Sequence, residues 1–196
     1  MLIVFIGPPG AGKGTQCKRL IDYLKVPHLS TGELLRRAKD QNSPLGVMAD
    51  SYMKHGRLVP DPLVMSIVGE RLDQPDCRVG CLFDGFPRTT GQAESLDIYL
   101  RDRGTPLDVV LELKVDENVL VERMIQRAKI EHRPDDTPDT IANRMQVYKT
   151  QTMPLLAYYS QRGLLESIDG LGTPDEVFDR IKAIVDQKRK APVTSA

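Results

Sequence analysis

Short apolar runs alternate with longer amphipathic stretches along most of this chain. Runs at 2–6, 26–29, 81–84, 109–115 and 164–168 have the length and residue types of β-strands. The first and fourth runs are almost continuously apolar, as expected of strands that are covered on both faces. Because strands that alternate with helices favour a parallel sheet, we predict an α/β fold with five parallel strands and helices on both faces.

The amphipathic stretches predict helices. Their expected ranges are 13–24, 31–40, 45–54, 62–72, 89–103, 117–128, 138–161 and 174–188. Asp61 before Pro62 is typical of an N-cap followed by proline in the first turn, and Gly56 is placed to end the preceding helix. Two helices fall between 30 and 60 without an intervening strand, and a polar loop interrupts the pattern near 127–137. Both segments are expected to project from the sheet and to move against it.

A glycine-rich run follows the first strand and opens the first helix. It reads Gly-Pro-Pro-Gly-Ala-Gly-Lys-Gly-Thr from Gly7 to Thr15. Strand, glycine-rich loop and helix in this order form a phosphate-binding loop, because the glycines let backbone N–H groups turn inward and the helix start adds further donors. Lys13 would place a positive charge on the terminal phosphates. The run predicts that the chain binds a nucleoside triphosphate.

Composition and charge exclude several classes of protein. The chain has 196 residues, and 27 basic residues balance 27 acidic ones. A neutral chain has no general field for nucleic acid, so a polyanion must be held by locally gathered arginines. The longest N-terminal apolar run is too short for a membrane span or a signal core, so we expect a cytoplasmic protein without a membrane partner. Three cysteines without C-x-x-C spacing predict neither a disulfide framework nor a four-ligand zinc site. The histidines, His28, His55 and His132, are too scattered to complete a metal site by spacing alone, and we expect them to be ordinary surface or strand residues.

A carboxylate and several guanidiniums complete the candidate chemistry. Asp84 ends the third apolar run, a position from which an aspartate commonly holds Mg²⁺ beside a phosphate loop. Arginines recur nearby, at Arg36, Arg57, Arg88, Arg123, Arg127, Arg133 and Arg144. Two anionic substrates with a phosphoryl group between them need several such permanently charged donors. No general base stands out, which favours an acceptor whose attacking oxygen is already anionic, such as a nucleotide phosphate.

The chain resembles the adenylate kinases over nearly its whole length, from residue 3 to about 185. The motifs that carry the resemblance are the glycine-rich run at 7–15, Leu-Ser-Thr-Gly-Glu-Leu-Leu-Arg at 29–36, Gly-Arg-Leu-Val-Pro-Asp at 56–61, Asp-Gly-Phe-Pro-Arg-Thr at 84–89 with Gln92, and Arg-Pro-Asp-Asp at 133–136. The resemblance implies a P-loop NTPase fold and reversible phosphoryl transfer from ATP to AMP, giving two ADP, by a cytoplasmic monomer that uses Mg²⁺. It implies a core domain of 1–29, 60–126 and 138–196, an AMP-binding lobe at 30–59, and a short lid at 127–137.

The resemblance also implies the site residues. Those expected to hold ATP are Gly10, Ala11, Gly12, Lys13, Gly14, Thr15, Arg127 and Gly172. Those expected to hold AMP are Thr31, Arg36, Arg57, Leu58, Val59, Gly85, Phe86, Pro87, Arg88, Gln92, Arg133 and Arg144. Those expected to act on the transferring group are Lys13, Arg88, Arg123, Arg133 and Arg144, while Asp84 would position hydrated Mg²⁺.

Two positions depart from the family pattern, and the form of the lid bears on metal binding. Glu33 stands where the family usually has aspartate, and His132 stands where glycine often precedes the lid arginine. The lid is the short form and lacks the cysteines that bind structural zinc in long-lid relatives, so no structural zinc is expected.

Two other functions stay open on the sequence. A UMP or CMP kinase would share the fold and the chemistry, but such enzymes usually carry asparagine at the position of Gln92 and often alanine at that of Thr31. A nucleotide-driven switch is the alternative of another class, because Lys114-Val115-Asp116 superficially resembles a guanine-reading motif. Leu113 stands where that motif needs an amide or hydroxyl, and the arginines would then have no purpose.

Overall fold

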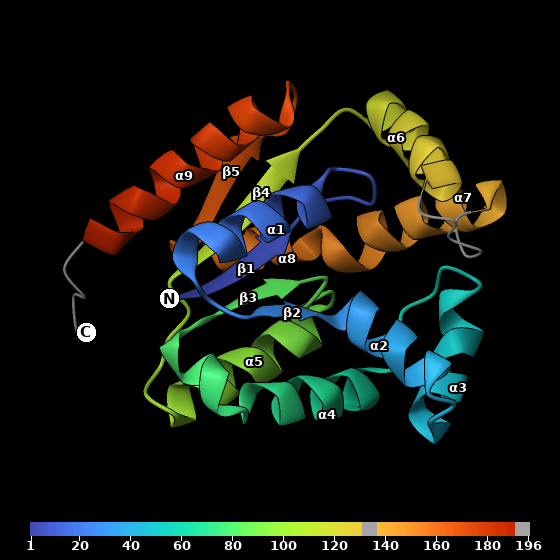
Figure 1. Ribbon diagram of the computed structural model, residues 1–196, viewed down its shortest axis with the longest axis horizontal. Coiled ribbons are helices and arrows are strands. Elements are labelled where there is room, and N and C mark those ends of the chain that lie inside the picture. The colour runs from blue at the N-terminus through green and yellow to red at the C-terminus, as the bar shows by residue number, and fades with distance from the viewer. Residues whose placement is uncertain (131–136, 191–196) are drawn as a thin grey trace.

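The computed structural model describes residues 1–130 and 137–190, with the side chains of 1–126 and 137–190. Its centre is a five-stranded sheet in the order β2-β3-β1-β4-β5, in which every neighbouring pair is parallel. The strands are β1 (Leu2–Ile6), β2 (His28–Ser30), β3 (Cys81–Asp84), β4 (Val109–Lys114) and β5 (Leu165–Asp169). The predicted five-stranded parallel sheet is confirmed, and β1, which leads into the phosphate loop, lies at its middle (Figure 1).

Helices surround the sheet and form a small lobe beside it (Figure 1). Their bounds are α1 (Lys13–Leu24), α2 (Thr31–Asp40), α3 (Pro44–Met53), α4 (Asp61–Leu72), the 3₁₀ turn η1 (Pro75–Val79), α5 (Thr90–Asp102), α6 (Glu117–Ile130), α7 (Pro138–Val147), the π turn η2 (Tyr148–Thr152), α8 (Pro154–Ser160) and α9 (Pro174–Lys190). Within the described segments, no helix combines the length and the apolar character that crossing a bilayer requires.

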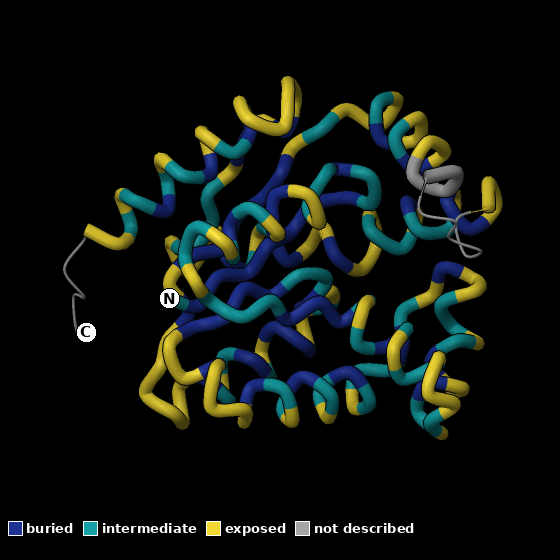
Figure 2. Tube along the Cα trace, viewed as in Figure 1, coloured by how far each residue is buried: buried dark blue, intermediate teal, exposed yellow. Residues whose placement is uncertain are grey.

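Alternating strand residues build two separate apolar cores. In β1, Ile3 and Phe5 pack on the side of α1 and α9, whereas Val4 and Ile6 pack on the side of α4, α5 and α8. All four are at most 3% exposed. Figure 2 shows the consequence, a dark-blue sheet between helices whose outer turns are exposed. A strand that is covered on both faces must be apolar throughout, which is the pattern that the sequence of β1 displays.

The lobe of α2 and α3 depends on a close backbone approach. A Cβ atom on Gly46 would lie 2.1 Å from the backbone carbon of Ala38, so only glycine lets α3 pack this tightly on α2. Ser43 caps α3 by accepting from the Gly46 N–H at 3.0 Å, and its hydroxyl donates to the Ala38 carbonyl at 2.9 Å. This pair of helices confirms the predicted strand-free stretch between 30 and 60.

Two helix predictions need correction. Asp61 is the first helical residue of α4 rather than its N-cap, which is Pro60; its carboxylate instead bonds to side chains of α5 and the turn before it, as described below. The single helix expected over 138–161 is interrupted by η2, where the Met153 N–H donates to the Tyr148 carbonyl at 2.8 Å, five residues back. Pro154 then begins α8, because proline lacks the N–H that a continuous helix would need.

Candidate active site

The loop between β1 and α1 has the backbone that phosphate binding requires. Gly10 and Gly12 adopt left-handed φ angles of 81° and 94°. A Cβ atom on Gly10 would also lie 2.7 Å from the Leu120 carbonyl oxygen, so this position is restricted to glycine. Lys13 folds back over the loop, and its Nζ donates to the Gly7 and Pro8 carbonyls at 2.7 and 2.9 Å. The backbone N–H groups of the loop, the N-terminus of α1 and the Lys13 ammonium group therefore lie close together, as a phosphate site requires.

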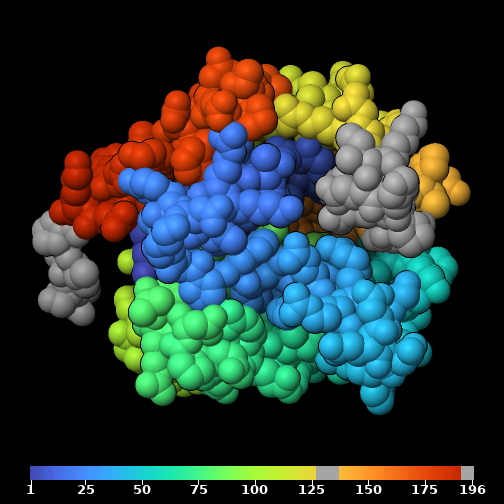
Figure 3. Space-filling model, viewed as in Figure 1, coloured from blue at the N-terminus to red at the C-terminus, as the bar shows by residue number. Residues whose placement is uncertain are grey.

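This loop borders a cleft of about 1400 Å³ that runs between the sheet edge and the helical lobe. Pockets for one small ligand usually measure about 300–1,000 Å³, so the cleft has room for two nucleotides. The space-filling view shows the surface hollowed between α1 and α2 (Figure 3). The cleft lies at the carboxyl ends of β1 and β3, where ligands of parallel α/β sheets bind.

Most of the predicted site residues line this cleft. They are Gly10, Ala11, Gly12, Lys13, Gly14, Thr15, Thr31, Arg36, Arg57, Leu58, Val59, Asp84, Gly85, Pro87, Arg88, Gln92, Arg123, Arg144 and Gly172. Phe86 lies beneath the cleft, where it is 1% exposed and its ring packs 6.1 Å from that of Phe83. Arg127 belongs to α6 but its side chain lies outside the described residues, as do Arg133 and His132.

A closed hydrogen-bond network fixes Gln92 at one end of the cleft. Its Oε1 accepts from the Arg88 N–H at 2.8 Å, and its Nε2 donates to Asp61 at 2.7 Å. Thr89 donates to the other Asp61 oxygen at 2.8 Å and caps α5 by accepting from the Gln92 N–H. Gln92 is 2% exposed. The amide is therefore held in one orientation, and Asp61 is the residue that holds it.

Three guanidiniums gather at the same end. Arg88 donates through Nε to the Gly85 carbonyl at 2.8 Å, and the Arg88 carbonyl accepts from the buried Thr152 hydroxyl at 2.9 Å. Arg88 is exposed to the open cleft. Its pKa lies below its ordinary value, first because the walls of the cleft displace part of the water around the guanidinium and then because Arg144 and Arg36 add positive charge, although Asp84 opposes them. Concentrated positive charge in a partly enclosed site favours a bound anion such as a phosphate.

Asp84 ends β3 beside the phosphate loop and lines the cleft. Burial alone would raise the pKa of this group, but the His28 ring, Lys13 and Arg88 outweigh it and hold the pKa below the ordinary value. The His28 Nε2 and an Asp84 oxygen are 3.4 Å apart. Because Nε2 is buried and has no hydrogen-bond partner among the described residues, we regard this contact as electrostatic. An ionised carboxylate next to a phosphate loop fits a hydrated Mg²⁺.

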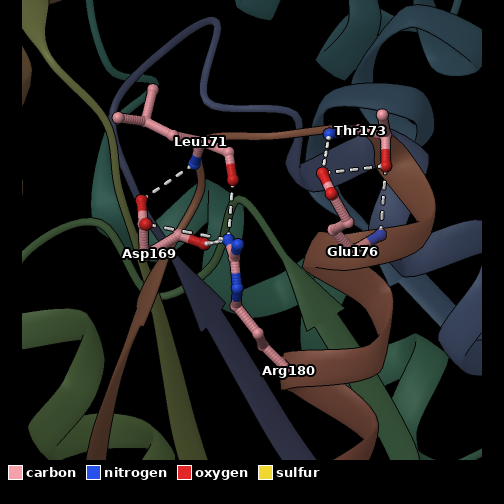
Figure 4. A network of polar contacts seen from close by, with 5 residues as sticks. All are labelled: Asp169, Leu171, Thr173, Glu176 and Arg180. Atoms are coloured by element: carbon pink, nitrogen blue, oxygen red, sulfur yellow. Dashed lines mark hydrogen bonds and ion pairs between the residues drawn. The ribbon is translucent and has the colours of Figure 1, made fainter.

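At the other end of the cleft, the loop after β5 is held by α9 (Figure 4). Arg180 donates to the carbonyls of Asp169 and Leu171 at 2.8 and 2.6 Å. Thr173 and Glu176 form a capping box: the Glu176 carboxylate accepts from the Thr173 N–H at 2.8 Å, and the Thr173 hydroxyl accepts from the Glu176 N–H at 3.3 Å. These contacts fix the backbone on both sides of Gly172.

The chain is similar in sequence to known proteins over most of its length. The family model for adenylate kinase matches residues 5–164. An adenylate kinase of Thermobifida fusca is 48% identical over 180 residues, covering 92% of this chain and 95% of the relative. An adenylate kinase of Maricaulis maris is 46% identical over 188 residues, covering 96% of this chain and all of the relative.

The chain belongs to the adenylate kinase family. A third relative, the adenylate kinase of Thermodesulfovibrio yellowstonii, is 43% identical and spans 96% of this chain. The expected family, the P-loop α/β fold and the assignment as an adenylate kinase are thus confirmed. The pyrimidine nucleotide kinase and the nucleotide switch are not favoured by these findings.

Two residues that support the cleft of this adenylate kinase, Asp61 and Thr152, are not among the site residues that the sequence predicts. Thr152 lies in the π turn and reaches the Arg88 carbonyl from 64 residues away. The sequence predicts Asp61 as a helix cap, whereas its carboxylate accepts hydrogen bonds from both Thr89 and Gln92. The motif Gly-Arg-Leu-Val-Pro-Asp at 56–61 carried a signal for Asp61, but no local pattern marks Thr152.

Proposed function

We propose that this adenylate kinase binds AMP in the half of the cleft formed by the α2–α3 lobe and residues 84–92, and ATP in the half formed by the phosphate loop and residues 169–173. The acceptor half supplies Gln92 for the base and Arg36, Arg88 and Arg144 for the phosphate. The donor half supplies backbone N–H groups and Lys13 for the phosphates, and backbone near Gly172 for the adenine. The observation that carries this division is the single cleft bordered by both sets of residues.

Lys13, Arg88, Arg123 and Arg144 are proposed to act on the transferring group. The AMP phosphate is already anionic and attacks without a general base, so the protein contributes alignment, charge neutralisation and exclusion of water. Arg123 lies next to the phosphate loop, with its guanidinium 3.4 Å from the Ala11 carbonyl. By the resemblance, Arg127 and Arg133 add positive charge from the 127–137 segment.

Mg²⁺ is expected to accompany ATP, and it would neutralise charge on the phosphates. Asp84 is the proposed residue that would orient its water shell, because it lines the cleft beside the phosphate loop and its pKa is held below the ordinary value. Glu33 also lines the cleft and would contact the same water shell. A structural zinc site is not part of the proposal.

The proposed division of the chain follows the same chemistry. The core domain comprises 1–29, 60–126 and 138–196, the AMP-binding lobe 30–59 and the short lid 127–137. Closing the lobe and the lid over the core would surround the phosphates with guanidiniums and expel water. We further propose that the enzyme acts as a monomer in the cytoplasm.

A coupled assay with ATP and Mg²⁺ over AMP, GMP, CMP and UMP tests the proposed function. We expect kcat/KM for AMP to exceed that for every other acceptor by at least tenfold, with no turnover after chelation of Mg²⁺. The pyrimidine acceptors serve as the matched comparison because they share the phosphate and ribose. Equal or better use of CMP or UMP would contradict the assignment of Gln92 to the adenine base.

A further inference from the structure

Three potential metal ligands that are far apart in sequence converge below the phosphate loop. They are the thiol of Cys17, the imidazole of His28 and the carboxylate of Asp84, and one ligand atom of each lies within 4.8 Å of the others. They come from three elements, α1, β2 and β3. The phosphoryl-transfer mechanism uses only Asp84, so the other two have no assigned role.

The parallel sheet explains why the three meet. His28 is opposite Leu82 in the β2–β3 pairing, and Asp84 follows two residues later on the same face of β3. Leu82 and Cys17 belong to the same apolar core, under α1. Cys17 in α1 therefore lies over the face of the sheet that carries His28 and Asp84.

The burial of these three side chains and the ligand types that they offer favour a metal site over an accidental contact. Cys17 is fully buried, and the side chains of His28 and Asp84 are 14% and 15% exposed. The buried His28 Nε2 has no hydrogen-bond partner within the described part of the chain. Thiolate, imidazole and carboxylate are the ligand set of thiophilic divalent cations rather than of Mg²⁺. A thiolate and a carboxylate together would also neutralise the dication.

The spacing suits such an ion after a small contraction. Zinc–ligand bonds of roughly 2.0–2.3 Å place neighbouring tetrahedral ligands roughly 3.3–3.8 Å apart. The His28–Asp84 pair, at 3.4 Å, already meets this separation. Asp84 borders the nucleotide cleft, so a fourth coordination position would face the cleft and accept water.

We propose that Cys17, His28 and Asp84 form an inhibitory binding site for a thiophilic divalent cation such as Zn²⁺ or Co²⁺. The thiol releases its proton to solvent as the metal–sulfur bond forms. The bound ion holds the Asp84 carboxylate away from the water shell of Mg²⁺ and adds positive charge beside Lys13. The inhibitory consequence rests on the proposed function, whereas metal binding itself does not.

Cobalt absorption tests the site without any reference to activity. Metal-free protein is titrated with Co²⁺, and the thiolate-to-cobalt charge-transfer band is followed in the near ultraviolet. We expect the wild-type band to saturate at one equivalent, Cys17→Ala to lack it, and His28→Gln to bind at least tenfold more weakly. Cys77→Ala is the matched control, since Cys77 is another buried thiol, and it should keep the band.

Activity forms the second arm of the experiment. With Mg²⁺ in excess, buffered micromolar Zn²⁺ should inhibit the wild type and Cys77→Ala, while Cys17→Ala keeps its basal turnover and resists inhibition. Thermal unfolding checks that each variant is folded. If Cys17→Ala does not fold, His28→Gln replaces it in the inhibition assay and should likewise resist Zn²⁺. The proposal is overturned if folded wild type gives no one-equivalent band, or if the band survives Cys17→Ala and disappears in Cys77→Ala. Bound metal without inhibition would overturn the link to Asp84.

Discussion

At the acceptor end of the cleft, a buried side chain is fixed by other side chains; at the donor end, an exposed loop is fixed through its backbone. Gln92 is 2% exposed and bonds to Asp61 and to the Arg88 N–H. Leu171 and Gly172 are exposed, and Arg180 holds the carbonyls around them from outside. Both ends are proposed to bind adenine, yet side-chain hydrogen bonds fix the acceptor end and hydrogen bonds to backbone carbonyls fix the donor end.

The difference has a consequence for specificity. A buried amide with fixed donors and acceptors discriminates between bases, because a wrong base leaves its polar groups unpaired. A loop whose backbone is held by a neighbouring helix contacts a base through its shape and a few carbonyl groups. Such a loop tolerates substitution of the side chains around it. We therefore expect changes at the acceptor end to alter which nucleotide is chosen, and changes at the donor end to alter how tightly ATP binds.

Lys13→Met tests the phosphate loop, where the transferring phosphoryl group is proposed to lie, and should have the largest effect on turnover. The lysine is proposed to stabilise charge on the transferring phosphoryl group, so kcat should fall roughly 10²–10³-fold. Because the Lys13 side chain bonds to the loop carbonyls of Gly7 and Pro8 and belongs to neither apolar core, the midpoint of thermal unfolding should stay close to that of the wild type. The measurement is steady-state turnover with ATP and AMP both saturating. Near-normal turnover would remove Lys13 from the mechanism.

Gln92→Asn tests the acceptor end. The shorter amide cannot bridge Asp61 and the Arg88 N–H in the same way, so the preference for AMP over CMP should fall about tenfold. The KM for ATP should change much less. Gln146→Asn, on an exposed turn of α7, is the matched control and should leave the preference intact. An unchanged preference in Gln92→Asn would mean that the base is recognised elsewhere.

Arg180→Ala tests the donor end. Loss of the two guanidinium bonds to the Asp169 and Leu171 carbonyls should loosen the loop and raise the KM for ATP about 3–10-fold. The KM for AMP should be unaffected. Arg189→Ala removes an exposed arginine near the other end of α9 and controls for the lost charge. Equal losses for ATP and AMP would break the contrast between the two ends.

Glu176→Gln should have the smallest effect, on stability. Hydrogen bonds from Thr173 hold the pKa of Glu176 below its ordinary value. A depressed carboxylate pKa in the folded state stabilises the fold above the ordinary pKa, and this contribution is lost as pH falls through the folded pKa. At neutral pH the variant should unfold about 1–3 °C lower than wild type, and the gap should close under acid conditions. A gap that is constant with pH would contradict the capping role.

The general architecture was predictable from the sequence because its signals are local. Continuous apolar runs identified β1 and β4, and the glycine-rich run identified the phosphate loop. What was missed depends on segments that meet only in the folded chain. Asp61 has the spacing of a helix cap, but the packing of α4 against α5 turns its carboxylate to Gln92.

The same reason explains the histidine and the π turn. His28 was interpreted as an ordinary surface or strand residue, and it does lie in β2; its contact with Asp84 arises only because β2 pairs with β3. Thr152 reaches Arg88 through a turn that no residue pattern between 138 and 161 specifies. Contacts between distant segments therefore limit what single-sequence reasoning recovers at a site.

The most direct test of the account supplies only ADP and Mg²⁺. If two nucleotides occupy the two halves of one cleft, the purified enzyme must convert ADP into ATP and AMP in equal amounts until equilibrium. Chromatography of the nucleotides over time measures both products, with Lys13→Met as the matched control for contaminating activity. We predict equal accumulation of ATP and AMP and no release of inorganic phosphate. Folded enzyme that leaves ADP unchanged, or that releases phosphate without forming ATP, would contradict the account.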